Sequence, residues 1–144
     1  MTVGMVPFNP SARRTLLLAH QEAVRSGHSR IAPGHILLGL VQDEGQAGKI
    51  LQEQGADLES IREIMISQTP ASEKASAKPG RIDLLDSTQR MLERVVPLAS
   101  QNKQTEIGNE QLLLALVELE DQRTQNILAA AGLDRNKIRE RLLK

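Results

Sequence analysis

Three histidines are the side chains of this 144-residue chain with the widest chemical range, since imidazole can bind a metal or carry a proton near neutral pH. They are His20, His28 and His35. No two of them are four residues apart, the sequence His-Glu-x-x-His is absent, and the chain has no cysteine to complete a zinc site. We therefore predict no metal site, no cofactor, and histidines that make structural hydrogen bonds.

A short glycine-containing segment, Gly45–Lys49 (GQAGK), is weakly similar to a phosphate-binding loop. The loop of ATPases has four residues between its first glycine and the Gly-Lys pair, followed by Ser or Thr, whereas here there are two residues and then Ile50. The Gly-x-Ser-x-Gly turn of serine hydrolases is also absent. We predict that this chain does not hydrolyse ATP.

Acidic residues such as Asp43, Glu44, Glu118 and Glu120 fall near predicted helix ends. Nothing in their spacing indicates a paired catalytic set, so we interpret them as solvent-facing carboxylates and predict that the chain is not an enzyme. A small enzyme that uses His35 or these acidic helix ends is a remaining alternative. Loss of an activity in a folded His35→Ala variant would support that alternative.

Composition excludes two classes of partner. Lys and Arg together number 18, as do Asp and Glu, and one Phe is the only aromatic residue besides histidine. Nucleic-acid binders usually carry a basic face and often stacking aromatics. The longest strongly apolar run, Ile36–Val41, is far shorter than the roughly 20 residues of a membrane span, and residues 1–7 lack a signal-peptide pattern. We expect a soluble cytoplasmic domain that binds neither nucleic acid nor membrane.

The chain contains an internal repeat. The segment His35–Val41 (HILLGLV) returns 76 residues later as Gln111–Val117 (QLLLALV). Other identities keep the same offset, and after one inserted residue the offset becomes 77, as in the match of Ile61–Glu63 (IRE) to Ile138–Glu140 (IRE). Agreement over such a length indicates a duplication.

The repeat defines the domain organisation. We predict repeat one at residues 8–66, a linker at 67–81 and repeat two at 82–144. The linker is polar and its only apolar side chains, apart from Pro70 and Pro79, are alanines. A lone unit of about 60 residues buries too little surface to be stable, so we expect residues 1–144 to form a single domain.

Each repeat is predicted to contain four helices and no strand. A stripe of Leu16, Leu17, Ala19, Ala23 and Val24 indicates the buried face of the first helix, which Asn9 would cap. Pro97 is expected to bend or end the equivalent helix near Val95. The predicted fold is therefore all-α, a pseudo-twofold bundle of two four-helix repeats. Its helices are expected at 10–26, 33–41, 46–54 and 58–66, then at 87–102, 109–119, 122–131 and 134–143.

These residues resemble a known family. The pattern is Phe8-x-x-x-Ala12-Arg13-Arg14, Ala23, Gly27-His28, Ile31, His35-Ile-Leu-Leu-Gly-Leu40 and Gly55, with Glu110-Gln-Leu-Leu-Leu-Ala-Leu116 in the second copy. Over residues 8–143 it is similar to the N-terminal domain of Clp ATPases, above all the ClpC type. The resemblance implies a module that sits on AAA+ rings and receives substrates or adaptor proteins, which the rings thread into a ClpP-type peptidase. It also implies a cytoplasmic location, or an organelle stroma for a plastid form.

The resemblance also implies a site. In ClpC-type domains each repeat can build a phosphoarginine pocket from a Thr after the leading Phe and a Glu before the His-Ile-Leu-Leu helix. This chain has Asn9 and Gly34 at those positions in repeat one, and Leu85 and Glu110 in repeat two. Because a carboxylate and both hydroxyls are missing, we predict that phosphoarginine is not bound.

The resemblance leads to a functional hypothesis. We expect a non-catalytic substrate- or adaptor-recognition module of a Clp unfoldase/protease system. The residues expected to line its binding grooves are Phe8, Asn9, Gly34, His35, Leu85 and Glu110. The alternative is a freestanding accessory protein that docks on the ATPase or peptidase, or that sequesters ligands of the unfoldase.

Overall fold

The computed structural model describes residues 2–3, 6–69, 83–101 and 106–143. Eight helices account for most of this part, which also contains four two-residue strands. The helices are α1 (Pro10–Arg25), α2 (Pro33–Val41), α3 (Gln46–Glu53), α4 (Leu58–Gln68), α5 (Asp86–Gln101), α6 (Asn109–Glu118), α7 (Gln122–Ala130) and α8 (Arg135–Leu143). The strands are β1 (Thr2–Val3), β2 (Val6–Pro7), β3 (Arg30–Ile31) and β4 (Asp83–Leu84).

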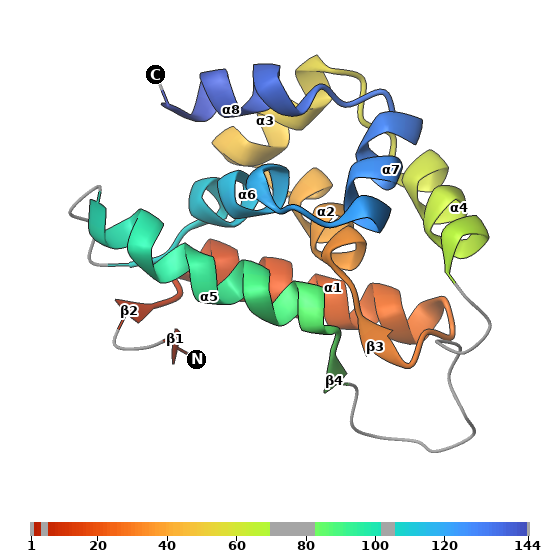
Figure 1. The fold of residues 1–144 in the computed structure, drawn as a ribbon, viewed down its shortest axis with the longest axis horizontal. Helices are drawn as coiled ribbons and strands as arrows, with labels where there is room; N and C mark the ends of the chain where they lie inside the picture. Colours follow the sequence, from red (N-terminus) through yellow and green to blue (C-terminus); the bar gives the residue numbers. More distant parts are fainter. Residues whose placement is uncertain (1, 4–5, 70–82, 102–105, 144) are drawn as a thin grey trace.

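The predicted all-α fold with two sets of four helices is confirmed. Helices α2 and α6 contact each other in the middle of the molecule, α1 and α5 pack below them, and α3 and α8 lie above (Figure 1). Helices α4 and α7 contact each other at one end. Most of the expected linker, residues 70–81, lies outside the described residues, and α4 runs into its first two positions. No described helix is long and apolar enough to cross a bilayer.

Short backbone pairings join the two repeats symmetrically. Phe8 forms a parallel bridge with Ile107, and Ile31 of β3 pairs in parallel with Leu84 of β4. The offset of 76 relates one pairing to the other, since it carries position 8 to 84 and position 31 to 107. The prediction of no strands missed these segments because two residues are too few to show an alternating pattern.

Helix α1 packs closely against α2 through small side chains. Its buried residues are Ala12, Thr15, Ala19, Glu22 and Ala23, whereas Leu17 and Val24 are more than half exposed. The expected stripe was therefore wrong in including Leu17 and Val24. The reason is the short distance between the helices: a Cβ on Gly39 of α2 would lie 2.6 Å from the Thr15 carbonyl oxygen.

Most predicted helix ends are confirmed. The Asn9 side chain accepts a hydrogen bond from the Ala12 N–H, and Asp57 accepts one from the Ser60 N–H. Gly55, at φ 81°, follows the end of α3 in the left-handed region that glycine favours. Pro97 does not end α5, which continues to Gln101.

One buried ion pair ties α4 to α1. The Arg62 guanidinium donates hydrogen bonds to both Glu22 carboxylate oxygens, at 2.9 and 2.7 Å, and also pairs with Glu59. Glu22 is 5% exposed. The hydrogen bonds from Arg62 lower the pKa of the Glu22 carboxyl despite its burial.

We predict that Gly39→Ala destabilises the chain by about 1–3 kcal/mol in urea unfolding, because the added Cβ meets backbone that must move. Intrinsic helix propensity would predict the opposite, a gain of about 1 kcal/mol. The offset of 76 relates Gly39 to Ala115, so Ala115→Gly is the matched control. It should lower the free energy of unfolding only by about the difference in helix propensity between alanine and glycine. An unchanged or more stable Gly39→Ala variant would contradict the close helix contact.

We predict that Glu22→Gln lowers the unfolding free energy by about 2–3 kcal/mol near neutral pH, because it weakens a buried charged hydrogen bond. The folded-state pKa of Glu22 lies below its ordinary value of 4.5, so the pair stabilises the fold above that pH. Its contribution is lost as the pH falls through the folded pKa, and the wild type and variant should then converge. The exposed partner Glu59 provides the control Glu59→Gln, which should change the pH dependence little. A gap between wild type and Glu22→Gln that persists at low pH would refute this role.

Candidate recognition site between the repeats

The structure brings the predicted site residues together across the repeats. Gly34 of repeat one and Leu85 of repeat two line one pocket, which we call the Gly34 pole. Asn9 of repeat one and Glu110 of repeat two both lie against Gly108, at a second place that we call the Glu110 pole. The structure therefore groups these positions across the repeats and not within each repeat. The cause is the crossed backbone pairing, which sets the start of each repeat's first helix beside the second helix of the other repeat.

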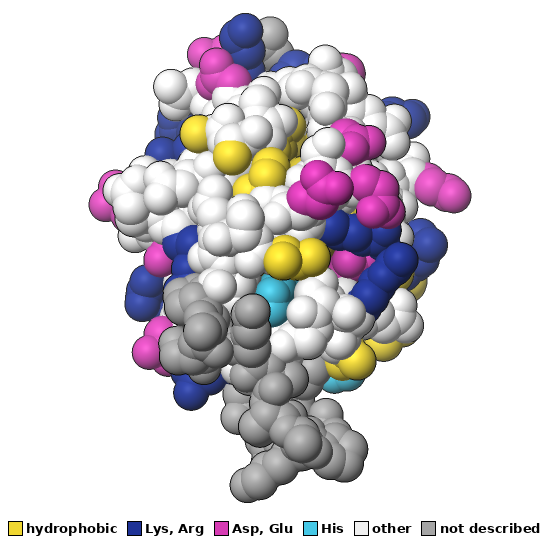
Figure 2. Space-filling model, turned by 90° about the vertical axis from the view of Figure 1, so that its right-hand side faces the viewer, with side chains coloured by type: hydrophobic (Ala, Val, Ile, Leu, Met, Phe, Trp, Pro, Cys, Tyr) yellow, Lys and Arg dark blue, Asp and Glu magenta, His cyan; other side chains and the backbone are white. Residues whose placement is uncertain are grey.

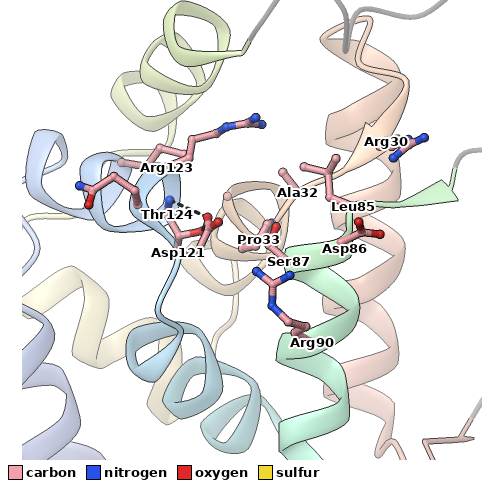
Figure 3. A pocket seen from close by; sticks show the side chains of 13 residues that line it. Arg30, Ala32, Pro33, Leu85, Asp86, Ser87, Arg90, Asp121, Arg123 and Thr124 are labelled. Atoms are coloured by element: carbon pink, nitrogen blue, oxygen red, sulfur yellow. Dashed lines mark hydrogen bonds between the residues drawn. The ribbon is translucent and has the colours of Figure 1, made fainter.

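The Gly34 pole is a pocket of about 300 Å³ where three helices begin. Figure 3 shows its lining side chains, with the first turns of α2, α5 and α7 around one space. Arginines come from β3, α5 and α7, and carboxylates come from the starts of α5 and α7. The residues that line it are Arg30, Ala32, Pro33, Gly34, Leu85, Asp86, Ser87, Arg90, Asp121, Gln122, Arg123, Thr124 and Ile127.

An apolar side chain of α4 packs directly against Gly34, beneath the pocket. A Cβ on Gly34 would lie 2.1 Å from the Met65 sulfur and 3.3 Å from Ile127 Cδ1. Met65 of α4 therefore fills the space that a longer residue would need. At the pocket's other side the Asp121 carboxylate is engaged, because it caps α7 by accepting bonds from the Thr124 N–H and hydroxyl.

The Glu110 pole is more polar. Asn9 uses its Oδ1 to cap α1, and its Nδ2 lies on the side of Gly108 and Glu110. Asn109, the first residue of α6, is 3% exposed, and both polar atoms of its side chain lack a hydrogen-bond partner among the described residues. Glu110 occupies the first turn of α6, where the helix dipole favours a carboxylate.

Phe8 and His35 are 1% exposed and offer no surface to a partner. His35 makes a structural hydrogen bond, as predicted: its Nδ1 accepts from the Ala32 N–H at 2.9 Å, at the start of α2. In repeat two Gln111 does the same, because its Oε1 accepts from the Gly108 N–H at 2.8 Å. The two repeats thus make the same hydrogen bond at the start of the helix with different residues, His35 and Gln111.

A second bond links two of the three histidines. His35 Nε2 lies 2.6 Å from His28 Nδ1, and both residues are buried. Since His35 Nδ1 accepts from the backbone, the shared proton belongs to His35 Nε2, which donates to His28. Among the described residues, no group of three or more His, Asp or Glu side chains gathers as metal ligands would.

The acidic helix ends divide into two kinds. Glu44 and Glu120 are exposed, as predicted. Glu118 is not simply solvated, because Arg94 and Arg139 both pair with it, and Asp43 accepts a hydrogen bond from the Gly48 N–H. The sequence interpretation missed the partners of Glu118 because they are distant along the chain, and it missed the partner of Asp43 because a turn separates the two residues.

Sequence reasoning also missed the arginines of the Gly34 pole, namely Arg30, Arg90 and Arg123. The available signal was the repeat itself. Once the repeats are paired across the twofold, the residues after Leu85 face the segment before Gly34. Figure 2 looks onto the side of α4, α7 and β3, where small apolar patches alternate with charges of both signs.

Comparisons with known proteins agree on one family. The family described as the Clp repeat (R) N-terminal domain matches residues 7–142. The chain is 31% identical over 138 residues to "Negative regulator of genetic competence ClpC/MecB" of Bacillus subtilis, covering 95% of this chain and 17% of that protein. It is 32% identical over 135 residues to "Uncharacterized protein Mb2686" of Mycobacterium bovis, covering 93% of this chain and 51% of that protein.

The fold has solved counterparts. The N-terminal domain of the caseinolytic protease associated chaperone ClpD from Arabidopsis thaliana superposes with a TM-score of 0.78 at 23% identity, covering 94% of each chain. At that identity the likeness shows the fold alone. The chain spans 17% of the Bacillus subtilis relative and about half of the Mycobacterium bovis one.

We predict that His35→Gln retains more stability than His35→Ala, by at least about 1 kcal/mol in urea unfolding. Glutamine can accept from the Ala32 N–H as Gln111 does at the equivalent position, whereas alanine leaves a buried donor unsatisfied. Gln111→His and Gln111→Ala form the matched pair in repeat two and should rank in the same order. Equal stability of His35→Gln and His35→Ala would show that the helix-start bond is unimportant.

Proposed function

This chain belongs to the Clp repeat N-terminal domain family, and we propose that it is a non-catalytic module that recognises substrate or adaptor proteins for a Clp AAA+ unfoldase. The observation that carries the proposal is the Gly34 pole, an open pocket between the repeats within the family fold. Its apolar floor and charged rim suit side chains of a polypeptide better than a small cofactor.

The two poles support recognition of more than one kind of group. The Gly34 pole combines Ile127 and Leu85 with arginines, whereas the Glu110 pole offers a carboxylate and the amide of Asn9. We propose that partner segments contact Asn9, Gly34, Leu85 and Glu110, while Phe8 and His35 hold the frame beneath them. Phosphoarginine is not the proposed ligand, because position 34 carries no carboxylate and neither Asn9 nor Leu85 carries a hydroxyl.

The proposed setting follows from the family. Clp ATPase modules, adaptor proteins and substrates are the expected partners. A ClpP-type peptidase would receive the unfolded substrate. The proposed location is the cytoplasm, or an organelle stroma for a plastid form. ATP-driven unfolding belongs to the ATPase modules and not to this domain.

A freestanding accessory protein is the second candidate. The Mycobacterium bovis relative favours it, because this domain makes up 51% of that protein, in contrast to 17% of the Bacillus subtilis ClpC. Such a protein would dock on the ATPase or peptidase, or would sequester ligands of the unfoldase. A phosphate-binding loop encoded downstream of Lys144 would favour the first candidate, and a stop codon there would favour the second.

We predict that the tagged chain captures a Clp ATPase, an adaptor or a recurrent set of substrates from native lysate, identified by mass spectrometry. Glu110→Lys and Leu85→Asp should each reduce capture several-fold. The first reverses the charge at a proposed contact, and the second places a charge at an apolar contact. Each has a matched control at an exposed position of the same residue type, Glu93→Lys and Leu17→Asp, which should capture normally.

The outcomes separate the possibilities. Capture that is lost in the pole variants but kept in both controls supports recognition at the poles. Capture of no Clp component, adaptor or substrate would contradict the proposed function. Equal loss in the pole and control variants would refute the proposed location.

A further inference from the structure

A second hollow lies away from both poles, between α5, α6 and α8. Its volume is about 330 Å³, and it is lined by Arg94, Val117, Glu118, Arg135, Asn136 and Arg139. Three of the six lining residues are arginines and one is a carboxylate, so the side chains around the hollow sum to a net charge of +2. We call it the arginine hollow.

The single carboxylate of the arginine hollow leaves much of its positive charge unmatched. Arg139 Nε donates to Glu118 Oε2 at 2.9 Å, but Arg94 Nη2 lies 3.7 Å from Glu118 Oε1, too far for a hydrogen bond. Glu118 Oε1 itself has no hydrogen-bond partner among the described residues. Arg94 and Arg139 are 63% and 54% exposed, so both guanidinium groups can reach a ligand.

Arg135 completes the arginine hollow in a fixed orientation. Its Nε donates to the Val117 carbonyl oxygen at 2.7 Å, which holds the guanidinium beside the end of α6. The remaining N–H groups of a guanidinium bound in this way keep their capacity to donate. An anionic group that enters the hollow would therefore meet one guanidinium held by the backbone and two exposed ones.

Repeat one shows how the same place is closed without a ligand. The offsets of 76 and 77 relate Arg94 to Leu18, Arg135 to Leu58 and Arg139 to Arg62. There Arg62 is neutralised by the buried carboxylate of Glu22, and two leucines stand where repeat two has arginines.

In repeat two, the acid that pairs with the equivalent arginine, Arg139, comes from a different position. The residue equivalent to Glu22 is Leu98, and Glu118 stands in place of Gln42. For the equivalent positions 18, 22, 41, 42, 58, 59 and 62 the net charge is −1, whereas 94, 98, 117, 118, 135, 136 and 139 sum to +2. A structural ion pair of repeat one thus corresponds to a surface of excess positive charge in repeat two.

We propose that the arginine hollow binds the carboxylate side chains of an acidic segment of a partner polypeptide. This inference rests on the proposed recognition function and adds the chemistry of one partner segment. Arginine clusters recognise acidic motifs through charge-assisted, often bidentate hydrogen bonds. Glu118 competes with the ligand for the two arginines. A partner carboxylate replaces Glu118 as the ion-pair partner of Arg94, and it binds Arg139 together with Glu118.

The test uses fluorescence anisotropy of a short labelled peptide of alternating glutamate and alanine, titrated with the full chain at low ionic strength. The Arg94→Gln/Arg139→Gln variant should bind it about tenfold more weakly, because two charged hydrogen bonds are lost. The matched control is Arg13→Gln/Arg14→Gln, which removes the same charge from exposed positions on α1 and should bind as the wild type does.

A gain of affinity provides a second readout that misfolding cannot imitate. Glu118→Gln removes the competing carboxylate and should tighten peptide binding about threefold or more. Equal loss in both arginine double variants would overturn the proposal by showing non-specific attraction. Absence of saturable binding, unchanged or weaker binding by Glu118→Gln, or binding only of a phosphoserine peptide would overturn it as well. Capture of Clp partners from lysate would persist in those cases, so the two proposals fail separately.

Discussion

The burial of α2 and α6 is the constraint on which the rest of the structure depends. Every residue of α2 and eight of the ten residues of α6 are buried, so neither helix can use water to satisfy the N–H groups at its start. In both, the third side chain of the helix folds back and accepts from the backbone N–H that precedes the helix. The two short apolar helices can then form the centre around which the six others pack.

The same constraint creates the recognition surface. Because the start of each repeat's first helix pairs with the segment before the other repeat's buried helix, the two poles each combine residues from both repeats. The backbone arrangement is symmetric, but the side chains at the two poles differ. Met65 packs beneath one pole, whereas the other pole keeps Glu110 and an Asn109 amide that has no hydrogen-bond partner among the described residues. Duplication thus gave two equivalent places that differ in charge and polarity.

Much of this could be predicted from the sequence. The repeat, the eight helices, the caps at Asn9 and Asp57 and the structural role of His35 all follow from local spacing and from the offset between the copies. The crossed pairing of the repeats could not be predicted in this way, because two-residue strands leave no pattern. The wrong burial of Leu17 and Val24 has a similar cause: only the close approach of Gly39 to Thr15 shows that small residues face the core. The partners of Glu118 come from two other helices, so local sequence gave no signal for them.

The central claim is that this domain binds partner polypeptides through the grooves between its helices. Its most direct test is an NMR titration of the isotope-labelled chain with the purified partner that the capture experiment identifies. The account predicts saturable shift changes that cluster at Asn9, Leu85 and Glu110, and around Arg94 and Arg139 for an acidic partner segment. Saturable binding with shift changes confined to other surfaces, or no shift changes at all, would contradict it.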